Sequence, residues 1–459
     1  MGVNLSRPGF AYLFMIVAAV AVFMDYLDSS IVAIALPEIA ADFNVTSSES
    51  SWVLISYLLS IGSLLVICGK IADRTGKYKP IFTTGFVLFT IVSLFCGLAP
   101  SMTVLIICRF IQGLAAALMV STATSLINLH LPIRIQALAT GVIATGGGIA
   151  LAAGPGIGGL LADVLSWHWI FFINVPIGIL GILGALILIP KDKPVEKTTT
   201  RFDGIGAGLF AITMVTLLTG LELGAQENWP LHSIILVCIA PIFGCIFVKY
   251  ELHHHDPVLS TRLFKNRTVM FASVSTMCST AAFFGSLFVL PFYFTDMGYS
   301  TLVSGLILLI SPACIALAGI PSGMLSLKYG CKFLCSSGTL VQFIGMGLLI
   351  FGIFSVQMPL IIAGLVISGI GSGLNEGPSI RRITIHSPLE LQGSSGGLVF
   401  TCMNVGCVLG VALFSVVAAA ASGNADYSIF GIAVSCILGA AFSLLAFITS
   451  RLARDTIKA

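Results

Sequence analysis

The chain has 459 residues, of which 57% are hydrophobic and only 9% charged, and its formal net charge is +3. Soluble domains carry about 25% charged residues, so this composition excludes an ordinary soluble protein. The apolar stretches are continuous and do not alternate, which predicts spanning helices in a lipid bilayer and excludes a barrel. The sequence has no basic block interleaved with aromatics that would indicate a nucleic-acid partner. It also has no GxxxxGK[ST] loop that would indicate ATP binding.

Apolar runs long enough to cross a bilayer recur along the whole chain, with short connections that leave no room for a sizeable soluble domain. We predict fourteen transmembrane helices, at 10–36, 50–69, 81–99, 103–128, 137–161, 169–189, 204–222, 232–249, 269–294, 302–325, 333–353, 358–380, 393–421 and 428–449.

The basic residues support this number of helices. An even number places both termini on one side, and every Lys and Arg except Arg109 then falls on the side of Arg7. Because cytoplasmic loops carry the excess of Lys and Arg, we expect a multi-pass protein of the cell (plasma) membrane with both termini cytoplasmic.

The segment GKIADRTGKYKP, residues 69–80, joins the second and third helices, and a weaker copy without the acid, GMLSLKYGCK, follows eight helices later at 323–332. Two such copies in the same orientation indicate a parallel repeat of two six-helix bundles, with a pair of helices inserted between them. We therefore predict an N-terminal bundle at 1–190, an inserted pair with a cytoplasmic linker at 191–250, and a C-terminal bundle at 251–459.

The first helix carries two acids, Asp25 and Asp28, and no Lys or Arg. Three residues apart on a helix, the two share one face. A carboxylate in the bilayer centre costs about 2.5–3.5 kcal/mol on insertion scales, so this face should look into a polar cavity. Such acids are candidates for binding protons and a cationic substrate.

Arg109, in the fourth helix, is the one basic residue expected inside the membrane. Its depth, about 9 Å from the outer end, is compatible with contact to the acids of the first helix. The alternatives are that it extends to the outer interface, or that Asp25 rather than Asp28 is its partner.

Further candidates lie in three other segments. Glu376, in the twelfth helix, is a second intramembrane acid for proton coupling or substrate binding, unless it pairs with Arg381 or Arg382. The 69–80 segment predicts a cytoplasmic gate between the bundles, and the glycine-rich fifth helix predicts a packing seam that hinges. The gate residues are Gly69, Asp73, Arg74, Gly76 and Arg134, and the hinge residues are Gly154, Pro155, Gly158 and Gly159.

Several motifs resemble those of the major facilitator superfamily, and in particular its fourteen-helix drug:proton antiporters, the EmrB/QacA-like group. GKIADRTGKYKP resembles the cytoplasmic-loop motif, and RFIQG, from Arg109, the fourth-helix motif. GPGIGG, from Gly154, resembles the antiporter motif, while LDSSIVAIALPEI and WHWIFFINVPIG are similar to signatures of the first and sixth helices. Ala33, Ala150 and His168 depart from the usual residues Asn, Gly and Arg.

The resemblance implies a proton-coupled secondary exporter of lipophilic, cationic small molecules such as drugs, with Asp28 as the responsive carboxylate and Arg109 assisting proton movement. Two other readings stay open: a proton symporter or facilitator that imports a small polar solute, and a non-transporting sensor or scaffold. We expect no enzymatic activity, no cofactor and no metal, because the adjacent His253, His254 and His255 lie in a loop where they rarely converge on one ion.

Overall fold

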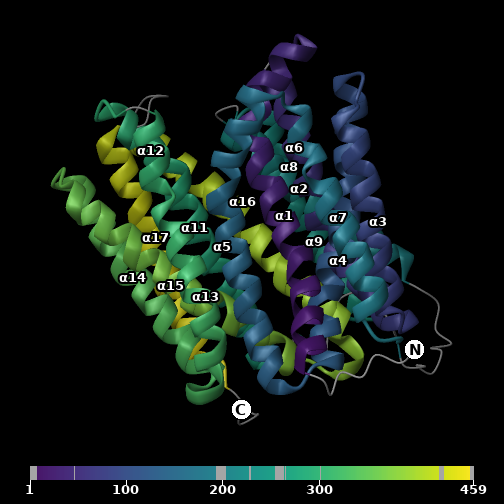
Figure 1. Ribbon diagram of the computed structural model, residues 1–459. Helices are drawn as coiled ribbons and strands as arrows, with labels where there is room; N and C mark the ends of the chain where they lie inside the picture. Colours follow the sequence, from purple (N-terminus) through teal and green to yellow (C-terminus); the bar gives the residue numbers. More distant parts are fainter. Residues whose placement is uncertain are drawn as a thin grey trace.

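The computed structural model describes residues 8–45, 47–192, 203–226, 229–253, 263, 265–299, 301–422 and 428–454. All regular elements among them are helical, and fourteen helices are long and apolar enough to cross a membrane. The first helix begins and the last ends at the same end of the bundle, the lower end in Figure 1. We call this the basic end, because the segments with Lys77, Arg134 and Lys328 lie there; it is the end that the charge pattern predicts to be cytoplasmic.

The N-terminal helices form one packed group around α1, α2, α3 and α4. Their bounds are α1 (Pro8–Phe43), α2 (Ser47–Thr75), α3 (Tyr78–Gly97), α4 (Met102–His130), α5 (Ile133–Val164), α6 (His168–Phe172) and α7 (Asn174–Leu188). Within the group, α1 packs along α5, and α4 packs between α2 and α3.

The C-terminal helices form a second group, to the left in Figure 1. Their bounds are α11 (Arg267–Asp296), α12 (Thr301–Leu308), α13 (Ile310–Tyr329), α14 (Cys331–Phe354), α15 (Met358–Ile385), α16 (Gln392–Ser422) and α17 (Ile429–Leu452), with a 3-10 turn at Leu389–Leu391. Its core includes buried side chains of α11, α14, α15, α16 and α17.

Between the two groups in sequence lie α8 (Gly204–Gln226) and α9 (Leu231–Glu251). These helices pack mainly on each other, and α8 also contacts α2 and α16. This packing agrees with an inserted pair, while the bounds 1–190, 191–250 and 251–459 remain a prediction.

Two predicted helices are interrupted. The single helix expected at 169–189 is divided into α6 and α7 at Ile173, and the one expected at 302–325 into α12 and α13 at Leu309. Pro176 and Pro312 lie four residues after the last residues of α6 and α12, and a proline cannot donate the hydrogen bond that would continue the helix there. Both prolines could have been read from the sequence as breaks.

The two copies of the 69–80 segment fold alike. Gly76 has a φ of 62° and Gly330 a φ of 83°. Each donates its N–H to the carbonyl four residues earlier, at Ala72 (2.9 Å) and Ser326 (3.0 Å). Because the left-handed conformation favours glycine, these residues end α2 and α13 in the same way.

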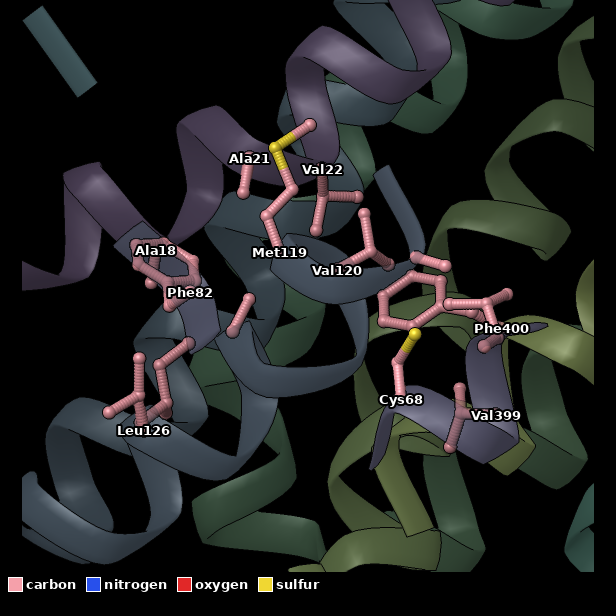
Figure 2. Packing of buried hydrophobic residues seen from close by; sticks show 14 of the residues in the cluster. Ala18, Ala21, Val22, Cys68, Phe82, Met119, Val120, Leu126, Val399 and Phe400 are labelled. Atoms are coloured by element: carbon pink, nitrogen blue, oxygen red, sulfur yellow. The ribbon is translucent and has the colours of Figure 1, made fainter. Parts of the chain in front are cut away.

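The two groups meet at the basic end and diverge toward the other end (Figure 1). At the basic end, α2 packs on α16, and α5 packs on α13. The largest core cluster crosses this boundary: Figure 2 shows Val399 and Phe400 of α16 next to Cys68 of α2. The contacts described next all depend on this arrangement.

Candidate functional site

Asp28 and Arg109 form an ion pair between α1 and α4, through one Asp28 oxygen and Nη1 of Arg109. Neither side chain is exposed. Arg109 also donates from Nε to the carbonyl of Val53 (3.0 Å), on α2. The alternative that Arg109 extends to the interface is therefore wrong, since its guanidinium is held inside the bundle.

Two amides complete the surroundings of Asp28. Its Oδ1 accepts hydrogen bonds from Nδ2 of Asn174 (2.7 Å) and Nε2 of Gln112 (3.2 Å). Gln112 Oε1 in turn accepts from Arg109 Nη1 (2.7 Å), and its Nε2 donates to Ser93 (2.8 Å). The Asp28 carboxylate is thus bound by side chains of α4 and α7, and a buried carboxylate requires partners of this kind.

Asp25 lies nearby but in a different environment. It is 8% exposed, and its Oδ1 accepts a hydrogen bond from the hydroxyl of Tyr57 on α2 (2.6 Å). The ring of Tyr57 lies 4.2 Å from Cζ of Arg109, so Tyr57 stands between the cation and this second acid. The hypothesis that Asp25 is the ion-pair partner of Arg109 is wrong here, because Asp28 takes that position.

Sequence reasoning did not single out Tyr57, Gln112 or Asn174. Gln112 occurs in the RFIQG segment and Asn174 in the WHWIFFINVPIG segment. A polar residue within a mostly apolar motif was therefore the signal that could have identified each of them as a site residue. Asn174 is the first residue of α7, directly after the interruption at Ile173. Tyr57 carries no such signal, since a tyrosine in an apolar helix is usually a packing residue.

Glu376 lies apart from this network, on α15, where it lines a partly open cavity of about 40 Å³. Most of the wall comes from the C-terminal helices, whereas the N-terminal helices contribute Tyr26, Gly147 and Leu151. Hydroxyl and amide side chains face it beside two aromatic rings: Thr276, Ser279, Thr280, Ser372, Asn375, Phe283 and Phe284. Among the described residues lining the cavity, Glu376 carries the charge.

The alternative that Glu376 pairs with Arg381 or Arg382 does not match the partners of those arginines. Arg381 donates to Ser326 Oγ (3.0 Å), and Arg382 donates to the carbonyls of Ser450 (3.1 Å) and Ala453 (2.9 Å). The side chain of Tyr26, from α1, lines the same cavity as Glu376.

At the basic end, Asp73 of α2 meets the first turn of α16. Its carboxylate accepts the N–H groups of Gly393 and Ser394 (2.7 Å for Ser394), the Ser394 hydroxyl (2.6 Å) and the Tyr78 hydroxyl (2.8 Å). A carboxylate at a helix N-terminus satisfies free N–H groups and interacts favourably with the helix dipole.

The other predicted gate residues have different surroundings. A Cβ at Gly69 would lie 2.1 Å from the carbonyl oxygen of Gly393, so the glycine permits α2 and α16 to touch. Gly76 forms the turn after α2. Arg74 is half-buried, and Arg134 is exposed at the start of α5. The described partners of Asp73 come from α16 and Tyr78 rather than from Arg134.

The predicted hinge residues of α5 face two ways. Added Cβ atoms at Gly154 and Gly158 would approach Ser30 (2.1 Å) and Ile31 (3.0 Å) of α1, whereas Gly159 has nothing within 4 Å. The side chain of Pro155 lies outside the described residues. The seam between α5 and α1 therefore uses Gly154 and Gly158, and hinging stays a prediction.

A bundle of fourteen spanning helices, with a buried ion pair in one group and a cavity between the two groups, defines a polytopic membrane transporter. The family model described as Major Facilitator Superfamily matches residues 18–411. The chain belongs to this family, whose members are transporters, which confirms the resemblance drawn from the motifs.

Curated relatives are about 30% identical along most of the chain. The riboflavin transporter RibZ of Clostridioides difficile is 30% identical over 413 residues, 88% of this chain and 87% of RibZ. The multidrug resistance protein Stp of Mycobacterium tuberculosis is 29% identical over 88% of this chain and 75% of Stp. The tetracenomycin C resistance and export protein of Streptomyces glaucescens is 30% identical over 89% of this chain and 76% of that protein.

Among solved structures, the human organic anion transporter MFSD10 (TETRAN) has the same fold, with a TM-score of 0.66. The alignment covers 96% of this chain and 98% of that one at 13% sequence identity. Together with the fourteen spanning helices, this likeness confirms the predicted fold class.

Proposed function

We propose that the protein is a proton-coupled secondary exporter of small lipophilic molecules, cationic ones above all, which works by alternating access. The observation that carries this proposal is the fully buried Asp28–Arg109 pair in one group of helices, close to a cavity that ends on a second acid, Glu376. Resistance and export proteins among the relatives support efflux as its direction.

Proton exchange takes place at Asp28. Protonation removes the charge that holds Arg109, and Arg109 itself remains charged, so the cation needs another partner. Asp25 lies one helical turn away on α1, and Tyr57 contacts both Asp25 and Arg109. Movement of Arg109 between the two acids would change how α1 packs on α2 and α4, which couples the proton to a change of conformation.

The cargo occupies the cavity beside Glu376. A cation gains from a carboxylate in a place of low dielectric, and the rings of Phe283 and Phe284 offer an apolar surface of the kind that lipophilic cargo prefers. Asp25 and Asp28 lie outside the described cavity lining, so direct contact between cargo and these two acids requires another conformation.

The Asp73–α16 contact closes the basic end in this conformation. Because it joins α2 to α16, the contact breaks when the two groups of helices rock apart at that end. Several hydrogen bonds and the N-terminus of α16 stabilise this closed gate. Together they stabilise it by more than an exposed ion pair, which contributes about 0–1 kcal/mol.

In the cell we place the protein in the plasma membrane with both termini cytoplasmic, exchanging cargo for protons and using no ATP. The test uses proteoliposomes with an imposed pH gradient, in which a lipophilic cation should drive proton movement in the wild type. Replacement of Asp28 by Asn should abolish this movement. Undiminished cation-driven proton flux in that variant would overturn the role of Asp28.

A second candidate is a proton symporter or facilitator that imports a small polar solute. The hydroxyl and amide groups around the cavity favour it, as does the relative named as a riboflavin transporter. Solute accumulation driven by an inward proton gradient supports import, whereas solute expulsion under the same gradient supports export.

A further inference from the structure

Helix α1 presents two different faces at one level. Asp25 and Asp28 point to α2 and α4, where they meet Tyr57 and Arg109. Tyr26 follows Asp25 by one residue, a rotation of about 100° on an α-helix, and lines the cavity instead. The same short stretch of helix therefore contacts both the buried acids and the cargo cavity.

The side chain of Tyr26 crosses the boundary between the helix groups and lines the cavity beside Glu376 on α15. Gly147 of α5 makes this approach possible. A Cβ at Gly147 would lie 3.0 Å from the Tyr26 ring and 3.7 Å from Oε1 of Glu376. Helices α1, α5 and α15 thus converge where Tyr26 and Glu376 lie side by side.

The electrostatic surroundings make this contact sensitive to cargo. None of the described residues that line the cavity is a Lys or Arg. A carboxylate in such a place is stabilised more by a cation than by a neutral phenol, because charge-assisted interactions are the stronger ones. A cationic cargo that binds Glu376 therefore competes with, and reorients, the Tyr26 hydroxyl.

We infer that Tyr26 is the positioning residue through which the charge at Glu376 is transmitted to α1. With an empty cavity, Tyr26 ties α1 to α15; with cationic cargo on Glu376, the tie loosens and α1 is released to rearrange Asp25 and Asp28. This inference rests on the proposed function, and it adds a residue that connects cargo binding with proton movement.

The test separates binding from coupling in the full-length protein, with tetraphenylphosphonium as the lipophilic cation. Tyr26→Phe keeps the ring and removes the hydroxyl, so the dissociation constant measured by tryptophan quenching should stay within about threefold of the wild type. Cation-driven proton flux in proteoliposomes should fall at least about tenfold. Tyr12→Phe is the matched control, since Tyr12 lies on the same helix but is 45% exposed, and it should match the wild type in both measurements.

A second variant disturbs the same Tyr26–Glu376 contact by a change on α5. Gly147→Ala would push the Tyr26 ring away from Glu376 and should also lower proton flux while the cation still binds. Thermal unfolding shows which variants are folded. Normal coupling in a folded Tyr26→Phe or Gly147→Ala variant would overturn the inference while leaving the proposed function intact. A wild type that binds no cation and moves no protons would overturn both.

Discussion

The carboxylate of Asp28 and the guanidinium of Arg109, on two different helices, pair in a place where neither is exposed. Removal of both charges from water is costly, and the attraction between them offsets the cost only while both are present. The pair therefore ties the stability of the N-terminal helices to the same atoms that we assign to proton exchange.

Removing one member of this pair should destabilise the protein strongly. We expect Arg109→Ala to lower the free energy of unfolding in detergent by about 3–5 kcal/mol, because Asp28 then remains buried without its cation. The double variant Asp28→Asn with Arg109→Gln should lose less than the sum of the single changes, as contacting residues are not additive. Arg451→Ala, at an exposed position, is the control. Equal losses in Arg109→Ala and Arg451→Ala would contradict the buried pairing.

Asn174 should matter for transport although it carries no charge. Its amide donates to Asp28, so Asn174→Ala leaves one hydrogen bond of this buried carboxylate unmade, at a cost of about 1–3 kcal/mol, and should slow cation-driven proton flux. The matched control is Asn404→Ala, whose amide donates to the Phe400 carbonyl within its own helix. If both variants transport at the same rate, Asn174 has no special role at Asp28.

The sequence was sufficient to predict the fourteen helices and the class of the fold, since apolar run length and the one-sided Lys and Arg distribution depend only on the bilayer. It also suggested a partner for Arg109, since an intramembrane cation requires one. It favoured Asp28 as that partner but left Asp25 open, because the choice depends on where Gln112 and Asn174 arrive from α4 and α7.

The position of Glu376 shows the same limit. Its depth in the helix allowed a pair with Arg381. Which residues Glu376 meets depends on the rotation of α15 about its axis and on the approach of α1, and neither can be read from the sequence around Glu376. The reason for the glycine at position 69 likewise became visible only with its partner on α16, more than three hundred residues later in the chain.

Asp73→Asn should open the basic end. The amide loses the charge that faces the N-terminus of α16 and cannot accept all the hydrogen bonds of Asp73, at a cost of about 1 kcal/mol. This shifts the ratio of closed to open molecules by about fivefold. Spin labels at Thr75 and Leu389, both exposed at this end, should report a longer distance in a larger fraction of molecules.

The control for this prediction is Asp192→Asn. Asp192 also accepts a backbone hydrogen bond, from the N–H of Lys79 (3.2 Å and 3.1 Å to its two oxygens), but Lys79 lies in α3 and Asp192 just after α7, so this contact does not join the two groups of helices. Its replacement should leave the distance between the labels unchanged. A wild-type distance distribution in Asp73→Asn would argue against the gate.

Gly69→Ala should prevent closure at the basic end by a steric route. The added methyl group would meet the Gly393 carbonyl oxygen at 2.1 Å, well inside contact distance. The methyl carbon is bonded directly to the backbone of α2 and the oxygen belongs to the backbone of α16, so no side-chain rotation relieves the clash. Molecules should therefore accumulate with this end open, and cargo export should fall by more than about tenfold while the protein stays folded. Gly347→Ala, in α14 with nothing within 4 Å, makes the same chemical change and should leave export unaffected and stability equal or slightly higher. Export rates in proteoliposomes, read together with the label distances at Thr75 and Leu389, decide the matter: loss of export with an unchanged, closed distance would show that Gly69 acts other than through contact with α16.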